Sequence, residues 1–174
     1  PDEGVHLRHE GIDLPILVMN SEQRNFEMLI EHQLEPELYS IPHMTRFIET
    51  AEQLGVEHYP VQLKIETGMN RLGISEGDLD TAISALKATN AVRVKAAFTH
   101  LSVADDPSEK EFTQGQLDLF RRLTARLKTG LGYSFLRHAL NSAGTTHYPE
   151  AQFDMVRLGI GLYGISSDPK EQPQ

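Results

Sequence analysis

The amino-acid sequence predicts an α/β fold in which parallel strands alternate with helices. Apolar runs of strand length recur along the chain, amphipathic segments of helical period lie between them, and glycine follows several of these helical segments. Strands that alternate with helices favour parallel pairing through right-handed crossovers. The sequence therefore predicts parallel strands with helices outside them.

The strand at 61–66 is the clearest of the predicted strands. Its apolar residues alternate with polar ones, and Gly68 and Asn70 provide a turn just beyond it. The six predicted strands are residues 15–19, 37–40, 61–66, 92–99, 137–140 and 154–157. A closed barrel of alternating strands and helices uses eight strands and about 250 residues. The sequence is therefore about two strand–helix units short of such a barrel.

The helices are predicted from apolar residues that recur three and four positions apart. Ser21 is expected to cap the second helix, and Gly55 is expected to end the third. The predicted helices are residues 3–10, 22–32, 43–54, 77–87 and 108–127, and a short helix can follow Ser142. Asp105 and Asp106 precede the longest of these helices, where capping is the expected role.

Composition excludes several classes of partner and site. The chain of 174 residues fits one domain, which we place at residues 1–165 and follow with a polar tail at 166–174. A formal charge of −9 argues against a nucleic-acid partner or an anionic membrane surface. The sequence has no cysteine, and its histidines lack paired ligand spacing, so no metal site is predicted. No apolar run approaches the about 20 residues that span a bilayer. With no signal peptide visible, a cytoplasmic location is the expectation.

Polar residues gather where the predicted strands end. Lys64 and Arg71 lie at or just past the end of one strand, and parallel sheets bind their ligands at that edge. The hydroxyl of Ser142 and the loop at 159–161 are of the kind that binds phosphate in barrels. Taken singly, each has an ordinary structural alternative, such as a helix cap, a glycine turn or a salt bridge.

Four stretches in order carry a family resemblance. They are VQLKIETGMNRLG (61–73), FTHLSVADD (98–106), HALNSAG (138–144) and MVRLGIGLYG (155–164). Together they resemble the barrel domain of alanine racemase, a pyridoxal-phosphate enzyme, over nearly the whole sequence from Glu3 to Gly164. The resemblance implies a partial (β/α)8 TIM-type barrel with the family's strands 3 to 8 and outer helices.

The resemblance also implies segments outside this sequence. The strand with the lysine that holds the cofactor, and the strand after it, would precede Pro1, and the C-terminal β-domain, with a tyrosine base for the facing subunit, would follow Gln174. The start at Pro1 without methionine, directly before a helix, fits a piece of a longer chain. The chain alone is therefore expected not to racemise alanine.

The resemblance gives roles to residues around the cofactor. Arg157 would donate to the pyridine nitrogen, and because a guanidinium keeps its proton the ring would stay unprotonated and act as a weaker electron sink. His100 would pack on or orient the ring. The implied cofactor-binding residues are His100, Asn141, Ser142, Arg157, Gly159 and Ile160, and the implied catalytic residues are Arg71, His100 and Arg157.

Arg71 and Lys64 would act together beside the substrate. The resemblance implies that Arg71 contacts the cofactor's phenolic oxygen and helps place the substrate carboxylate. Lys64 matches a lysine that is carbamylated in many members and braces that arginine. Glu66 stands where the family usually has Asp, and Asn70 where it often has Gly. Asn tolerates the left-handed conformation, so the turn is expected to survive, while the longer carboxylate can shift Arg71.

The predicted function is interconversion of L-alanine and D-alanine for peptidoglycan synthesis, by a dimer that uses pyridoxal phosphate. One alternative is a barrel protein that binds pyridoxal phosphate without racemising, and another is an unrelated phosphate-binding barrel enzyme. PILVMN (15–20) and NSAG (141–144) also resemble the racemase half of fused cell-wall ligase–racemase proteins. His138 and Tyr163 could line the pocket, although core packing explains them equally well.

Overall fold

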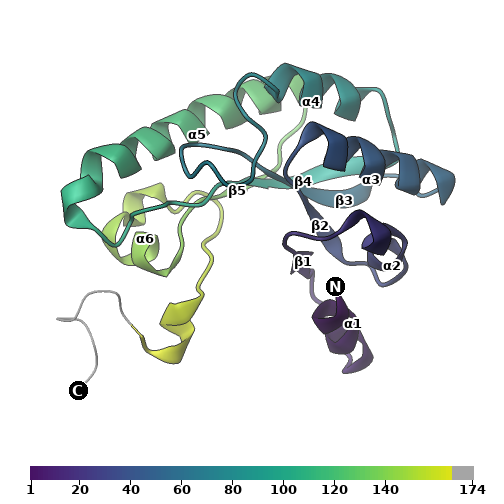
Figure 1. The fold of residues 1–174 in the computed structure, drawn as a ribbon, viewed down its shortest axis with the longest axis horizontal. Helices are drawn as coiled ribbons and strands as arrows, with labels where there is room; N and C mark the ends of the chain where they lie inside the picture. Colours follow the sequence, from purple (N-terminus) through teal and green to yellow (C-terminus); the bar gives the residue numbers. More distant parts are fainter. Residues whose placement is uncertain (166–174) are drawn as a thin grey trace.

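The computed structural model describes residues 1–165, and the predicted tail at 166–174 lies outside them. One sheet runs through the molecule, with its five strands in chain order and every neighbouring pair parallel. The strands are β1 (Leu17–Val18), β2 (Glu35–Leu38), β3 (Tyr59–Lys64), β4 (Val92–Phe98) and β5 (Leu136–His138). Because helices connect these strands, the prediction of an α/β fold is confirmed (Figure 1).

The helices lie mainly on one face of the sheet. The α-helices are α1 (Asp2–His9), α2 (Phe26–Glu31), α3 (Ile41–Gln53), α4 (Leu79–Lys87), α5 (Lys110–Leu131) and α6 (Ser142–His147). Short 3-10 turns are η1 (Gln23–Asn25), η2 (Pro107–Glu109), η3 (Pro149–Ala151) and η4 (Ile160–Tyr163). Figure 1 shows α3, α4 and α5 along one side of the sheet, while α1 and the η4 segment project from the other.

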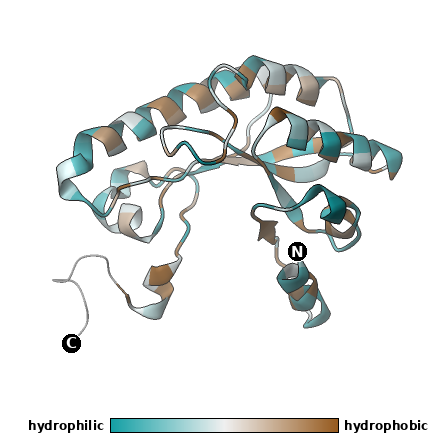
Figure 2. Ribbon diagram, viewed as in Figure 1, coloured by the Kyte–Doolittle hydropathy of each residue, from teal (hydrophilic) through white to brown (hydrophobic). Residues whose placement is uncertain are grey.

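The apolar core fills the space between the sheet and the helices α3 to α5. Val61 and Leu63 of β3 are fully buried there, against residues such as Phe47 of α3 and Phe120 of α5. Apolar residues recur along the whole length of α5 (Figure 2). The opposite face of the sheet, which we call the inner face, carries the alternate residues Gln62 and Lys64. These polar residues are also buried, so the alternation in β3 separates an apolar face from a polar interior.

The predicted sixth strand is wrong, because residues 154–157 form no strand. This segment makes two backbone hydrogen bonds beside β5, from the Asp154 amide to the Arg137 carbonyl at 3.0 Å and from the Arg157 amide to the Leu140 carbonyl at 2.9 Å. Phe153, just before it, has a left-handed φ of 53°. A chain that leaves such a turn does not enter the regular register of a ladder. Within residues 1–165, β5 is the last strand of the sheet.

Two further expectations were wrong in detail. The second strand is Glu35–Leu38 rather than 37–40, because Ser40 already caps α3, where its hydroxyl accepts the His43 amide at 3.3 Å. Ser21 does not cap a helix. It is buried, its hydroxyl has no hydrogen-bond partner within the described chain, and Glu22 is the residue before η1.

A β-bulge interrupts the pairing of β3 with β4. Val61 pairs with Val94, whereas the next residue, Gln62, pairs with Ala96, so Lys95 has no direct partner. The bulge turns β4 so that Lys95 reaches Glu35 of β2 and Phe98, three residues later, stacks on a β5 side chain. The side chains of Lys95 and Phe98 therefore both lie on the inner face.

Candidate functional site

The residues expected at the site gather at the carboxyl ends of the strands. Lys64 is the last residue of β3, His100 follows β4 by two positions, and His138 is the last residue of β5. Arg157 reaches the same edge from the segment beside β5. Because all neighbouring strands are parallel, their carboxyl ends meet at one edge of the sheet, where barrels bind their ligands.

Arg157 has five acceptors, one of which is the His138 carbonyl, 3.3 Å from Nη1. Its Nη1 donates to Nδ1 of His138 at 2.8 Å, and its Nη2 donates to the carbonyls of Thr99 at 2.7 Å and Ala139 at 3.2 Å. Nη2 also lies 3.4 Å from Nδ1 of His100. Among residues 1–165 the Nε hydrogen of Arg157 has no recorded acceptor. Burial lowers the pKa of Arg157 to about 10, which still leaves it a cation at neutral pH.

His138 is a neutral imidazole in this arrangement. A guanidinium can only donate, so Nδ1 of His138 must accept from Arg157, and Nε2 must carry the proton that it shares with the Gln62 amide oxygen at 3.1 Å. Burial, and then the charge of Arg157, lowers the pKa of His138 to about 3. The ring also stacks on Phe98, with centroids 4.8 Å apart and planes at 4°. The two hydrogen bonds therefore fix the tautomer of His138, and together with the stacking they fix the orientation of its ring.

The hydrogen-bond chain continues along the inner face, away from the site. Nε2 of Gln62 donates to Glu35 at 2.7 Å, and Lys95 donates to the other oxygen of the same carboxylate. The donors therefore run in one direction, from Arg157 to His138, from His138 to Gln62 and from Gln62 to Glu35. Sequence reasoning did not identify Glu35 or Gln62 as site residues. Their signal was present, since a buried strand with polar residues at alternate positions has a polar second face.

His100 lies among cations. Burial is the largest cause of its lowered pKa, about 4, and the charges of Arg157, Lys64 and Arg71 add to it. The ring is therefore neutral at physiological pH. Its carbonyl accepts from Nε2 of Gln116 on α5 at 3.2 Å, which fixes the end of β4 to the long helix.

Ser142 joins the two segments that were expected to bind phosphate. Its Oγ accepts the amides of Gly159 at 3.0 Å and Gly161 at 3.1 Å. Asn141 caps α6, because its side-chain oxygen accepts the Gly144 amide at 2.8 Å. Ile160 begins η4, and the first amides of a helix have no acceptor inside it. The structure thus brings one hydroxyl and several backbone amides together at one exposed point.

Lys64 and Arg71 have different surroundings. Lys64 is buried, with its Nζ 3.2 Å from Oε1 of Glu37, whereas Arg71 is exposed in the loop after β3. Within the described residues no ion pair or hydrogen bond is recorded between them, so the brace between them stays a prediction. Asn70 has a left-handed φ of 54°, as expected, and its side-chain Nδ2 donates to the Gly68 carbonyl at 3.2 Å. The turn thus keeps its shape with Asn at this position.

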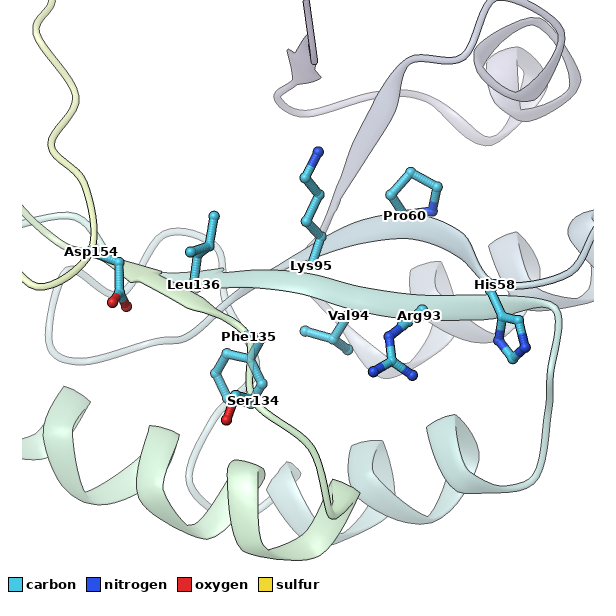
Figure 3. Close-up of a pocket in the computed structure, with 9 residues that line it drawn as sticks. All are labelled: His58, Pro60, Arg93, Val94, Lys95, Ser134, Phe135, Leu136 and Asp154. Atoms are coloured by element: carbon cyan, nitrogen blue, oxygen red, sulfur yellow. The ribbon is translucent and has the colours of Figure 1, made fainter.

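A groove of about 480 Å³ lies at the other end of the sheet. It is lined by His58, Pro60, Arg93, Val94, Lys95, Ser134, Phe135, Leu136 and Asp154. Figure 3 shows Phe135 on the side of the helices and Lys95 on the opposite side. Most of these residues belong to the amino-terminal halves of β3 to β5 or precede them, so the groove is distinct from the edge that holds Arg157.

Residues 1–165 lack two further features. No helix there combines the length and apolar character needed to cross a membrane. No three His, Asp or Glu side chains in this part of the chain are grouped so that they could hold a metal ion.

Comparison with known proteins gives the family. Residues 1–167 match the family model described as alanine racemase, N-terminal domain. The chain is 37% identical over 163 residues to the alanine racemase of Syntrophobacter fumaroxidans. This match covers 93% of the chain and 43% of that protein. It is 34% identical over 171 residues to the alanine racemase of Sorangium cellulosum, at 95% and 44% coverage.

Solved structures agree with the sequence comparison. The alanine racemase of Corynebacterium glutamicum superposes with a TM-score of 0.86 at 30% identity, over 97% of this chain and 47% of that one. That of D-cycloserine-producing Streptomyces lavendulae gives a TM-score of 0.90 at 28% identity, over 99% and 46%. A Bartonella henselae alanine racemase with covalently bound pyridoxal phosphate, 23% identical with a TM-score of 0.84, shares the fold.

These matches confirm the resemblance read from the four stretches, and the partial barrel that it implied fits the five-stranded sheet. The chain spans less than half the length of the relatives it matches. It belongs to the alanine racemase N-terminal domain family.

Proposed function

We propose that this chain is the cofactor-binding barrel part of an alanine racemase, in which pyridoxal phosphate supports the interconversion of L-alanine and D-alanine. The observation that carries the proposal is Arg157, whose guanidinium is held by His138 and by backbone carbonyls while its Nε hydrogen remains available. A cation that is held in place and keeps one uncommitted donor suits an uncharged ring nitrogen.

The second half of the cofactor site is the cluster around Ser142. The Ser142 hydroxyl and the amide of Ile160 would hold the phosphate. The Gly159 amide, which donates to Ser142 Oγ, would position that hydroxyl, and Asn141 would fix the start of α6. Hydroxyl and backbone amide donors are the groups that barrels use for phosphate. When bound, pyridoxal phosphate withdraws electrons from the amino acid and makes its Cα proton removable.

The remaining residues act through charge and packing. Arg157 stays protonated, so it favours an unprotonated ring nitrogen, and the neutral His100 packs beside the ring without adding positive charge. Arg71, exposed in its loop, is available to a substrate carboxylate. The proposed substrate is alanine, the proposed assembly a homodimer, and the proposed setting the cytoplasm, where the product would serve peptidoglycan synthesis.

Binding of the cofactor tests the assignment of Arg157 and Ser142. Pyridoxal phosphate retained on dialysis should fall about tenfold or more in Arg157→Ala and Ser142→Ala, because each change removes a charged or polar contact. The exposed residues Arg24 and Ser84 provide matched controls, and their alanine variants should retain as much as the unchanged chain. Equal retention in all five proteins would contradict the assignment.

A chimaera separates racemisation from cofactor binding alone. Residues 1–165 would replace the matching segment of the Syntrophobacter fumaroxidans enzyme, and formation of D-alanine would be followed in a coupled assay. Turnover that is lost in the Arg157→Ala chimaera supports the proposal. A chimaera that binds the cofactor without turnover supports the alternative of a non-racemising barrel. The chain of 174 residues by itself is the negative control, and no turnover is expected from it.

A further inference from the structure

Glu35 lies at the far end of the hydrogen-bond chain that begins at Arg157. Its Oε2 accepts from Nε2 of Gln62 at 2.7 Å, and its Oε1 accepts from Nζ of Lys95. An amide nitrogen and an ammonium both offer hydrogens and no lone pair. Glu35, which is buried, therefore acts as an acceptor on both of its oxygens.

Gln62 transmits this direction to His138. Because the amide nitrogen donates to Glu35, the amide oxygen is turned toward Nε2 of His138, 3.1 Å away. An amide oxygen can only accept, so Nε2 must carry the ring proton and Nδ1 keeps its lone pair. Nδ1 is the atom that accepts from Nη1 of Arg157 at 2.8 Å. The two ends of the chain thus require the same tautomer independently.

A chain with the opposite direction would not hold Arg157. If the Gln62 amide were turned over, its nitrogen would donate to Nε2 of His138, the ring proton would move to Nδ1, and two donors would face each other at the guanidinium. Gln62 and His138 are buried, so water does not replace a lost partner there. Glu35 opposes the turn, because its oxygen would then face the amide oxygen, acceptor against acceptor.

Lys95 offers Glu35 an ordinary structural role as well. The two side chains form an ion pair, and Lys95 is 37% exposed on the side of the sheet opposite the helices (Figure 3). Such a pair stabilises the fold whichever of the two positions carries the carboxylate. The direction of the hydrogen-bond chain does depend on that placement, because only the group at position 35 contacts Gln62.

We infer that Glu35 is a positioning residue for Arg157, and that it selects, through Gln62, the tautomer of His138 that can accept the guanidinium. The inference deepens the proposed function, on which the importance of Arg157 rests. Glu35 itself does not act on the cofactor. It acts through two side chains, each of which can be turned in only one way.

Exchanging the two charged residues separates the direction of the chain from the ion pair. Glu35→Lys combined with Lys95→Glu keeps opposite charges together but puts a group that only donates beside Gln62. The amide should then turn its oxygen toward position 35 and its nitrogen toward His138, and the ring proton should move to Nδ1. The bond from Arg157 to the ring should be the one that breaks, because the guanidinium keeps its backbone acceptors.

Nitrogen-15 NMR of labelled histidine rings in the chain of 174 residues reads the tautomer. Correlations between ring protons and ring nitrogens distinguish a proton on Nε2 from one on Nδ1, and the signals missing from His138→Asn identify the ring. The unchanged chain should show the Nε2 form, and the exchange variant the Nδ1 form. The dissociation constant of pyridoxal phosphate, from equilibrium dialysis, should rise about tenfold in the exchange variant, because Arg157 loses a charge-assisted contact.

A rescue and a matched control distinguish direction from damage. Gln62→Glu added to the exchange variant can accept from position 35 and from His138 together, so the Nε2 form and the original dissociation constant should return. Arg46→Glu combined with Glu49→Arg exchanges an exposed ion pair on α3 and should change neither measurement.

The ring of His138 decides the inference. A folded exchange variant that stays in the Nε2 form would overturn it at any affinity for the cofactor, and so would a changed ring that Gln62→Glu does not restore. Should the exchange variant not fold, Gln62→Lys replaces it, because it puts a group that only donates between Glu35 and the ring; the Nδ1 form then supports the inference and the Nε2 form overturns it. If the unchanged chain binds no pyridoxal phosphate, the proposed function fails, while the tautomer still tests the role of Glu35.

Discussion

His138 shows how one buried side chain fixes another. Arg157 donates to its Nδ1, so a proton on that nitrogen would place two cations in contact. The pKa of His138 in the folded chain is about 3, against about 6.5 in an unfolded one. Because the folded state binds fewer protons, this contribution to stability is complete above about pH 6.5 and is lost as the pH falls toward 3.

Replacing His138 should therefore change how stability depends on pH. His138→Asn removes the titrating ring, so the difference in unfolding free energy between the two proteins should shrink between pH 7 and pH 4.5, by on the order of 2 kcal/mol. Urea unfolding at the two pH values measures it. A constant difference for His138→Asn would mean that the ring binds protons equally in the folded and the unfolded chain, and would contradict the prediction.

The loop after β3 depends on a glycine at one position. Gly73 has a φ of 145°, and a Cβ built there would lie 2.5 Å from the Glu66 amide nitrogen. Its own amide donates to the Tyr39 carbonyl at 3.1 Å, which ties the loop to the segment after β2. Because the obstacle is backbone, no side-chain movement can remove it.

Two glycine substitutions should have opposite effects. Gly73→Ala should lower the free energy of unfolding by at least about 2 kcal/mol, from the backbone conformation and the contact together. Gly115→Ala, within α5 and with nothing inside 4 Å of its Cβ, should raise it by about 0.5 to 1 kcal/mol. Urea unfolding of both variants checks the pair. Destabilisation by Gly115→Ala would contradict the second of these expectations.

At the scale of elements, periodicity in the sequence predicted most helices and five of the six strands. It succeeded for β3 and α5 because burial on one face leaves a regular pattern. It failed at 154–157, because Phe153 leaves the extended region and the segment 154–157 makes two backbone hydrogen bonds beside β5 rather than a regular ladder. An apolar stretch beside a strand and a strand have the same composition, and only the backbone path separates them.

The candidate site divides in a similar way. Ser142, Gly159 and Arg157 could be predicted because each lies in a recognisable stretch, and the structure gathers them at one edge of the sheet. The chain of hydrogen bonds through Gln62 to Glu35 could not, since it depends on which strands are neighbours and in what register. The residues in these hydrogen bonds lie 27 positions apart for Gln62 and Glu35 and 76 apart for His138 and Gln62, so they leave no local pattern in the sequence.

At the scale of the molecule, the sheet has two weakly protected margins. β1 is two residues long and pairs on one side with β2. On the outer side of β5, the segment 154–157 makes two backbone hydrogen bonds, from the amides of Asp154 and Arg157. Apolar side chains of η4 are exposed, with Leu162 at 70% and Tyr163 at 83%. Unpaired edges and exposed apolar residues both favour association.

The chain of 174 residues should therefore self-associate. Sedimentation over a wide concentration range should give an average mass that rises with concentration, because the two edges of the sheet pair with other chains. Leu162→Glu combined with Tyr163→Glu should reduce the association without changing the melting transition, since both side chains lie outside the core. A monomer at the highest concentration, with a cooperative melt, would contradict the prediction.

The bulge at Lys95 has a consequence for how this sequence tolerates change in length. The extra residue lets Lys95 reach Glu35 while Phe98 and His100 still arrive at the site with the correct orientation. Removing Ala96 alone would leave one residue in each strand between the pairs Val61–Val94 and Leu63–Ala97, so Ala97 and Phe98 would keep their partners and their faces. A deletion of one residue at the bulge would thus make the ladder regular without reversing the side chains on either side of it. A change in length by a single residue is therefore expected to be tolerated better at the bulge than elsewhere in β4.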